Sequence, residues 1–74
     1  MVDMEGHQQR HHEAAVLSQQ LVGLAVEDAT RLAEERGFQV RVLAEGELMT
    51  MEFVSNRVNL IYGSDRTVLQ ASAG

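Results

Sequence analysis

The chain has 74 residues, a formal net charge of −5 from 11 acidic and 6 basic side chains, and no cysteine. This length allows one small domain, and without cysteine neither a disulfide nor a Cys-based metal site can support it. The acidic balance disfavours nucleic acid and anionic membrane surfaces as partners, because both require a positively charged footprint. The longest apolar stretches fall far below the roughly 20 residues needed to span a bilayer.

The N-terminal region is expected to lie outside the packed domain. Residues 1–12 are polar and offer few groups that could offset the entropy of ordering, which favours an extended or disordered tail. A short amphipathic helix is permitted over residues 13–22, where apolar residues recur at helical spacing. The resulting division is a flexible polar tail over 1–17 and a domain over 18–74.

The first residues also bear on location, since they contain no basic segment followed by an apolar run and hence no signal peptide. The chain is then cytoplasmic if it is full length, exported by another route, or a trimmed form.

The three histidines, His7, His11 and His12, suggest a metal site, because His7 and His11 are spaced to share a helix face and Glu13 is a fourth possible ligand. A terminus with little support for a helix usually leaves such side chains solvated. We therefore expect no metal and no other cofactor.

Residues 26–36 form the clearest regular element, a helix with one apolar stripe and one charged face. Gly37 provides its C-terminal stop. Ala25 stands where a capping side chain is usual, which forfeits about 1 kcal/mol of helix stability. A short extended entry over residues 21–23 precedes the helix.

Three strands follow, over residues 38–43, 58–62 and 66–70, with a turn at 63–65 between the last two. The first two strands are joined by a long connection and can pair in parallel, whereas the last two should pair antiparallel. The expected fold is therefore α+β, with one helix packed on a small mixed sheet and a long exposed loop.

The long connection carries the strongest functional signal, because hairpin loops usually need only about 2 to 5 residues and longer structured loops tend to carry function. Its segment 50–53 (Thr-Met-Glu-Phe) with 57–60 (Arg-Val-Asn-Leu), together with Leu-Val-Gly at 21–23 and Val-Glu-Asp-Ala at 26–29, resembles the potato inhibitor I family of serine protease inhibitors. The resemblance covers residues 18–74.

That resemblance implies a protease-binding loop centred on Met51, whose side chain would enter the primary specificity pocket, with the scissile-type bond between Met51 and Glu52. The implied contact residues are Leu48, Met49, Thr50, Met51, Glu52, Phe53 and Val54. Because methionine is long and apolar, a subtilisin-, chymotrypsin- or elastase-like enzyme is favoured over a trypsin-like one.

The resemblance also implies that Arg57 supports the loop from below by hydrogen-bonding its backbone or the side chains of Thr50 and Glu52. Asn59 stands where plant members have a second arginine, and this Arg-apolar-Asn pattern is similar to a related group of small microbial peptidase inhibitors. The supporting shell is then looser than in the plant inhibitors.

Alternatives remain open for these residues: Met49 and Met51 as core side chains, Arg57 as a solvated strand residue, and Glu52 as a surface acid. Catalysis is not expected, because Ser55, Ser64 and Asp65 have no candidate base among the structured residues. A second functional hypothesis is a non-inhibitory interaction or self-association module on the same fold, either monomeric or forming oligomers by exchange of elements between protomers.

Overall fold

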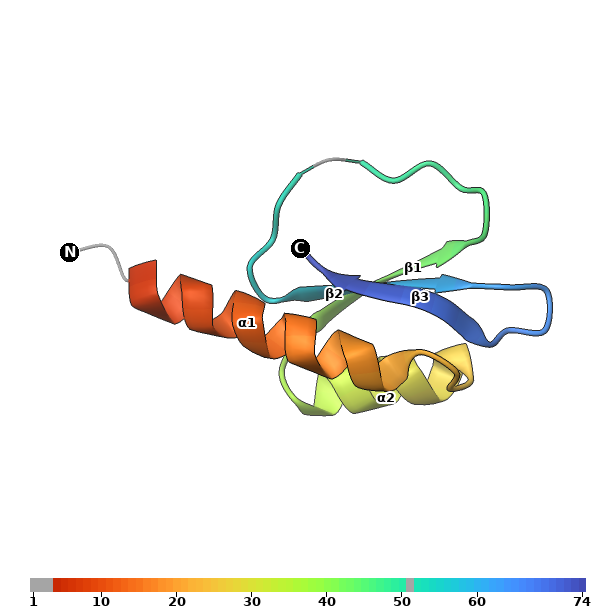
Figure 1. Ribbon diagram of the computed structural model, residues 1–74, viewed down its shortest axis with the longest axis horizontal. Coiled ribbons are helices and arrows are strands. Elements are labelled where there is room, and N and C mark those ends of the chain that lie inside the picture. Colours follow the sequence, from red (N-terminus) through yellow and green to blue (C-terminus); the bar gives the residue numbers. More distant parts are fainter. Residues whose placement is uncertain (1–3, 51) are drawn as a thin grey trace.

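Two helices and three strands make up the fold of the computed structural model, which describes residues 4–50 and 52–74 (Figure 1). In chain order they are α1 (Met4–Leu21), α2 (Val26–Glu35), β1 (Gln39–Ala44), β2 (Arg57–Tyr62) and β3 (Val68–Ala73). The expected α+β class is confirmed, with two helices on the sheet instead of one. None of the helices in the described part of the chain is both long and apolar enough to cross a membrane.

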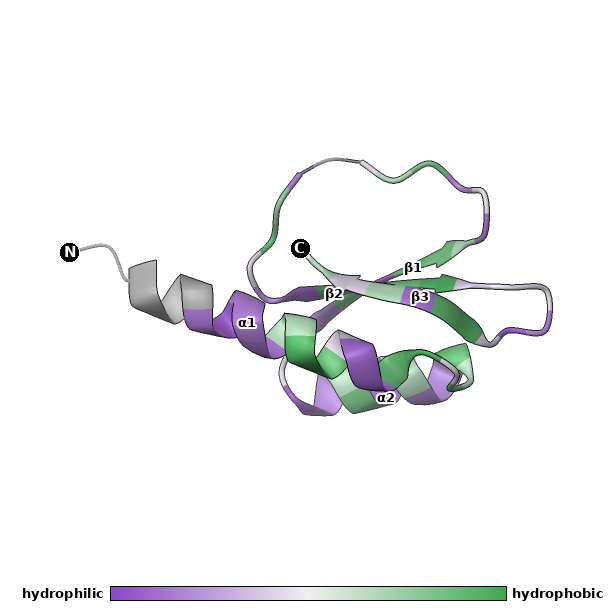
Figure 2. Cartoon of the chain, in the orientation of Figure 1, coloured by the Kyte–Doolittle hydropathy of each residue, from purple (hydrophilic) through white to green (hydrophobic). Residues whose placement is uncertain are grey.

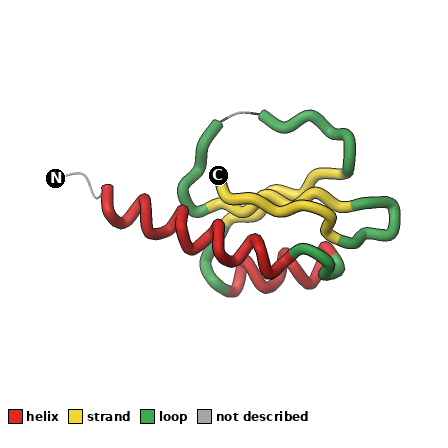
Figure 3. Tube along the Cα trace, viewed as in Figure 1, coloured by secondary structure: helices red, strands yellow, loops and turns green. Residues whose placement is uncertain are grey.

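The sheet has the order β1-β2-β3, with β1 parallel to β2 and β2 antiparallel to β3, as expected. Val40 pairs with Val58 on one face, and Arg41 pairs with Asn59 on the other. Both helices pack on the first face, whereas the long β1–β2 connection passes over the second (Figures 1 and 3). The sheet therefore separates an apolar layer from a polar layer beneath the loop.

The core lies between the two helices and the apolar sheet face, where green segments of α1, α2 and the strands meet in Figure 2. The helices contribute residues spaced three or four apart and the strands contribute every second residue, as expected for helices packed on a pleated sheet. The buried apolar side chains are Ala14, Leu17, Leu21, Val26, Ala29, Ala33, Phe38, Val58, Leu60 and Val68.

Helix α1 differs from the expected extended tail over residues 1–12, since it is helical from Met4 onward, and residues 1–3 lie outside the described part. The apolar spacing over residues 13–22 correctly indicated a helix but not its length. Ala14 and Leu17, on the N-terminal side of the expected division, are fully or almost fully buried. Tertiary contacts such as these stabilise a helix whose own sequence is mostly polar.

Helix α2 begins and ends close to the expected positions. Ala25 makes no side-chain cap bond, as its identity implies. At the other end Gly37 has a φ of +84°, and the amides of Gly37 and Phe38 donate to the carbonyls of Glu34 and Ala33 at 3.0 and 3.1 Å. This is a Schellman arrangement, and it directs Phe38 into the core at the start of β1.

Two other boundaries need correction. Leu21 belongs to α1, so the extended entry expected over residues 21–23 begins later, where the Gly23 amide donates to the Val68 carbonyl at 2.9 Å and Ala25 bridges Thr67. The third strand begins at Val68 and not at residue 66, because Arg66 adopts a φ of +62° within the preceding turn. The strand then continues to Ala73, beyond the expected end at residue 70.

Candidate functional site

The β1–β2 connection is attached to the sheet at both of its ends. At its start Gly46 has a φ of +93°, and the Glu47 carboxylate accepts a hydrogen bond from the Ala44 amide at 2.6 Å. At its end the Arg57 amide donates to the Val54 carbonyl at 3.3 Å. The connection therefore forms an arch whose two ends are held by hydrogen bonds, and it is not an open linker (Figure 3).

Several side chains of this arch face solvent. Leu48 is 96% exposed, Phe53 65% and Met49 39%. Met49 is therefore not a core residue, which removes that alternative for it. Met51, the expected contact residue, lies outside the described residues. Large apolar side chains held away from the core on a loop are typical of an interaction site.

Arg57, at the first position of β2, lies beneath the C-terminal half of the arch. Its Nη2 donates to the Glu52 carbonyl at 3.0 Å and its Nη1 donates to Glu52 Oε1 at 3.3 Å. Only 10% of the Arg57 side chain is exposed, so it is not the solvated strand residue of the alternative interpretation. A partly buried guanidinium that holds both the backbone and the carboxylate of one residue restricts that residue strongly.

Arg41, in β1, holds the other half of the arch, a role that was not predicted from the sequence. Its Nη1 donates to Thr50 Oγ1 at 2.7 Å and to Glu52 Oε1 at 3.1 Å, and its Nη2 reaches the Thr50 carbonyl at 3.4 Å. The sequence did carry a signal, because alternation in β1 places Arg41 on the face opposite Val40 and Val42. What it lacked was the register of the parallel pair.

Asn59 stands where the resemblance implied a second supporting arginine, and it acts on the arch indirectly. It is only 4% exposed, its Oδ1 accepts from Arg41 Nε at 3.0 Å, and its Nδ2 donates to the Gly74 carbonyl at 3.2 Å. The same carbonyl accepts from Arg57 Nε at 2.9 Å. Asn59 therefore orients Arg41, and the second arginine comes from the neighbouring strand.

Glu52 is the acceptor that these groups share, and its ionisation reflects this. Hydrogen bonds from the Thr50 side chain and from the backbone of Glu52, together with the Arg57 hydrogen bond and the charge of Arg41, lower the pKa of Glu52 from 4.5 to about 2. The carboxylate is therefore charged at all but strongly acidic pH. Glu52 is exposed as the alternative surface-acid interpretation requires, yet it is also the centre of the polar network.

The geometry thus holds the residues on both sides of position 51. Thr50 is attached to β1 through Arg41, and Glu52 is attached to β2 through Arg57 and to β1 through Arg41. The two strands are directly paired, so the two halves of the arch share one rigid base. An assignment of Leu48, Met49, Thr50, Glu52, Phe53 and Val54 to a protease contact stays a prediction.

The two histidine side chains that the structure describes have different surroundings. His11 packs on Phe53, His12 is exposed, and the side chain of His7 lies outside the described residues. Over the described ranges 4–50 and 52–74, no group of three or more His, Cys, Asp or Glu side chains is placed to hold a metal ion.

A small helix-and-sheet domain that presents an exposed loop on a charged, hydrogen-bonded support has the architecture of a small protein inhibitor of proteases. The peptidase inhibitor I78 family model matches residues 14–71, and the chain belongs to this family. The protein is accordingly a protease inhibitor and not an enzyme. The expectation of a small protease inhibitor family is confirmed, whereas membership of the potato inhibitor I family in particular is not shown.

Two solved structures have a similar fold. The structure of the elastase inhibitor AFUEI matches with a TM-score of 0.62 at 20% identity, and the match covers 90% of this chain and 98% of the AFUEI chain. The structure of the bitter gourd trypsin inhibitor matches with a TM-score of 0.67 at 22% identity, and the match covers 74% of this chain and 85% of the inhibitor chain. No curated protein sequence gives a significant match. At these identities the likeness concerns the fold.

Proposed function

We propose that this protein inhibits a serine protease of the subtilisin-, chymotrypsin- or elastase-like kind through a substrate-like loop over residues 47–54. In this proposal Met51 enters the primary specificity pocket and the reactive peptide bond joins Met51 to Glu52. The mode of action is that of the potato inhibitor I family, which the loop sequence resembles.

The observation that carries the proposal is the pair of arginines beneath the loop. Arg41 and Arg57 hold Thr50 and Glu52, the residues on either side of position 51. A loop ordered before association avoids much of the conformational entropy that an ordinary peptide substrate loses on binding. The free energy of contact with the enzyme is then available for affinity.

The same pair explains how such a loop would resist hydrolysis. A protease serine attacks the Met51 carbonyl carbon, the bond to the Glu52 nitrogen breaks, and an acyl-enzyme forms. Arg57 continues to hold Glu52 through its carbonyl and carboxylate, so the newly formed amine stays near the ester. The amine can then re-form the peptide bond before water replaces it, and net cleavage is slow.

The target class follows from the side chain at position 51. Methionine is flexible and apolar and fits a deep hydrophobic pocket, whereas a trypsin-like pocket carries a carboxylate that requires Lys or Arg. The two solved structures of similar fold are those of an elastase inhibitor and of a trypsin inhibitor, so inhibitors of both kinds of enzyme are found on this fold.

Titration against subtilisin, chymotrypsin, elastase and trypsin tests the proposal, with sequencing of any cleaved product. We expect sub-micromolar inhibition of at least one of the first three enzymes and slow cleavage at the single bond 51–52. Met51→Lys should shift the preference toward trypsin. Met49→Lys is the matched control, because it places the same charge on the same loop two residues earlier and should not create trypsin inhibition.

Rapid digestion at several loop positions, or no effect on any of the four enzymes, would contradict the proposal. Unchanged inhibition by Met51→Lys would show that Met51 is not the contact residue. A non-inhibitory interaction module would instead show association by size-exclusion chromatography without inhibition.

A further inference from the structure

We propose that His11 of α1 is a positioning residue for the loop, because its ring supports Phe53 and fixes the part of the arch that follows the reactive bond. The inference rests on the proposed inhibitory function and adds a loop contact from α1, which lies outside the arginine network. It concerns an aromatic contact between elements that are far apart in the chain.

The contact joins two rings. The ring centroids of His11 and Phe53 lie 5.1 Å apart with an interplanar angle of 56°, which is a favourable tilted arrangement. Phe53 nevertheless remains 65% exposed, so one side of the ring is supported while much of it still faces solvent. A side chain held in this way can be presented to a partner without being free to rotate.

A second support for Phe53 connects it to the arginine network. A Cβ placed on Gly74 would lie 3.7 Å from Phe53 Cδ2, in ordinary van der Waals contact, so the ring passes close over this glycine. The Gly74 carbonyl accepts the hydrogen bonds from Arg57 and Asn59. Phe53 thus lies between helix α1 and Gly74, the residue that follows β3.

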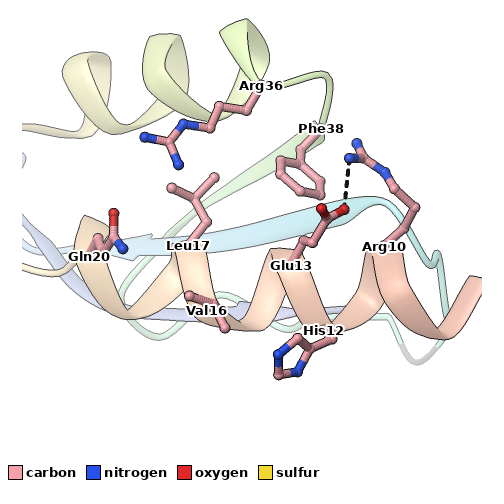
Figure 4. A pocket seen from close by; sticks show the side chains of 8 residues that line it. All are labelled: Arg10, His12, Glu13, Val16, Leu17, Gln20, Arg36 and Phe38. Carbon is pink, nitrogen blue, oxygen red and sulfur yellow. Dashed lines mark hydrogen bonds and ion pairs between the residues drawn. The ribbon is translucent and has the colours of Figure 1, made fainter.

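Helix α1 is itself held in place around His11, which a positioning role requires. The residue next to His11, Arg10, donates to the Gly37 carbonyl at 3.2 Å, and its Cζ lies 4.2 Å from the centroid of the Phe38 ring. Figure 4 shows Arg10 directed toward Phe38 and toward Glu13, across a groove between α1 and the α2–β1 connection. One turn later Ala14 is fully buried.

The imidazole of His11 supports Phe53 through ring contact and not through a hydrogen bond of its Nδ1 atom. His11 Nδ1 is buried and has no hydrogen-bond partner among the described residues. A buried polar atom without a partner costs free energy, so a phenyl ring at this position should support Phe53 at least as well as the imidazole does.

The experiment compares His11→Ala, His11→Phe and the matched control His12→Ala. His12 is the adjacent histidine, is exposed, and points away from Phe38 and the α2–β1 connection in Figure 4. Amide hydrogen exchange at Phe53 and Val54 is measured beside the exchange at Leu60 in the core, and inhibition constants are measured against the protease that wild type inhibits best.

We expect His11→Ala to raise exchange at Phe53 and Val54 and to weaken inhibition by about 3- to 10-fold, while exchange at Leu60 is unchanged. His11→Phe should restore both quantities, and His12→Ala should change neither. Equal effects of His11→Ala and His12→Ala, or failure of His11→Phe to restore the loop, would overturn the inference. A uniform rise that includes Leu60 would assign His11 to general stability and overturn it as well.

The two proposals fail in different ways. If wild type inhibits no protease, the proposed function fails, and the exchange measurements still decide whether His11 holds Phe53 in place. If wild type inhibits and His11→Ala inhibits equally well with unchanged exchange, the function stands and the positioning role is refuted.

Discussion

Replacement of Arg41 by methionine removes the loop support that comes from β1 while preserving most of the side chain's apolar stem. Arg41 donates to Asn59 Oδ1 on the sheet and to Thr50 on the loop, so its loss has two separable consequences. One concerns the fold, and the other concerns the order of the loop.

The structure gives a magnitude for each consequence. Asn59 is only 4% exposed, and leaving its Oδ1 without a partner should lower the free energy of unfolding by about 1–3 kcal/mol. Thr50 and Glu52 are exposed, so water can replace part of what the loop loses, and the bonds at 2.7, 3.1 and 3.4 Å together should contribute about 1–2 kcal/mol to loop order. At about 1.4 kcal/mol per factor of ten, inhibition should weaken roughly 5- to 30-fold.

Urea denaturation measures the first quantity, and inhibition constants with a wild-type reference measure the second. Arg31→Met is the matched control, because it makes the same substitution in an exposed pair with Asp28 on α2, where a surface ion pair contributes at most about 1 kcal/mol. The reasoning is refuted if Arg41→Met inhibits as strongly as Arg31→Met does, since Arg41 would then contribute nothing to the active form of the loop.

Three further predictions concern the loop carboxylate, the first helix and the second helix. The pKa of Glu52 in the folded protein is lowered from 4.5 to about 2, so the contribution of its carboxylate to loop order is fully present above about pH 4.5 and is lost as the pH falls through about 2. The NMR shifts of the Thr50 and Glu52 amides should therefore titrate with a midpoint near pH 2, and Thr50→Val should move that midpoint toward 4.5. A wild-type midpoint near 4.5 would contradict the network. Leu17→Ala should lower the free energy of unfolding by about 2–5 kcal/mol in urea denaturation, because Leu17 is 2% exposed. The control Val16→Ala, at a side chain 44% exposed, should change that free energy by no more than about 0.5 kcal/mol. Equal effects of the two substitutions would show that α1 does not pack on the domain. Ala25→Ser should supply the missing cap of α2 and raise stability by about 1 kcal/mol in thermal unfolding, and an unchanged melting temperature would show that the cap position cannot use a hydroxyl.

Much of the fold could be read from local patterns. The period of α2, its stop at Gly37 and the alternation of β1 and β2 are properties of neighbouring residues, so the sequence indicated them with small errors at the ends. The long connection made a parallel first pair possible, because a parallel pair cannot be closed by a tight turn, and the structure has this parallel pair.

Helix α1 and the start of β3 were harder to predict, because neither follows from a local sequence pattern. Most of α1 is polar and gives little amphipathic signal, and its order comes from Ala14, Leu17 and Leu21 packing on the sheet together with Arg10 reaching Gly37. The start of β3 depends on Arg66 adopting a positive φ, which arginine seldom does and which no local rule would have assigned to it.

The sequence by itself indicated the long connection as the candidate binding loop and placed Arg57 at the junction between that connection and the second strand. Only the tertiary structure decided the partners: the parallel register places Arg41 beside Asn59, and the packing of α1 places His11 against Phe53. These are contacts across 18 and 42 positions of the chain, since 59 − 41 = 18 and 53 − 11 = 42. A local pattern sets which way a side chain points, but the register and packing of distant elements determine what it meets.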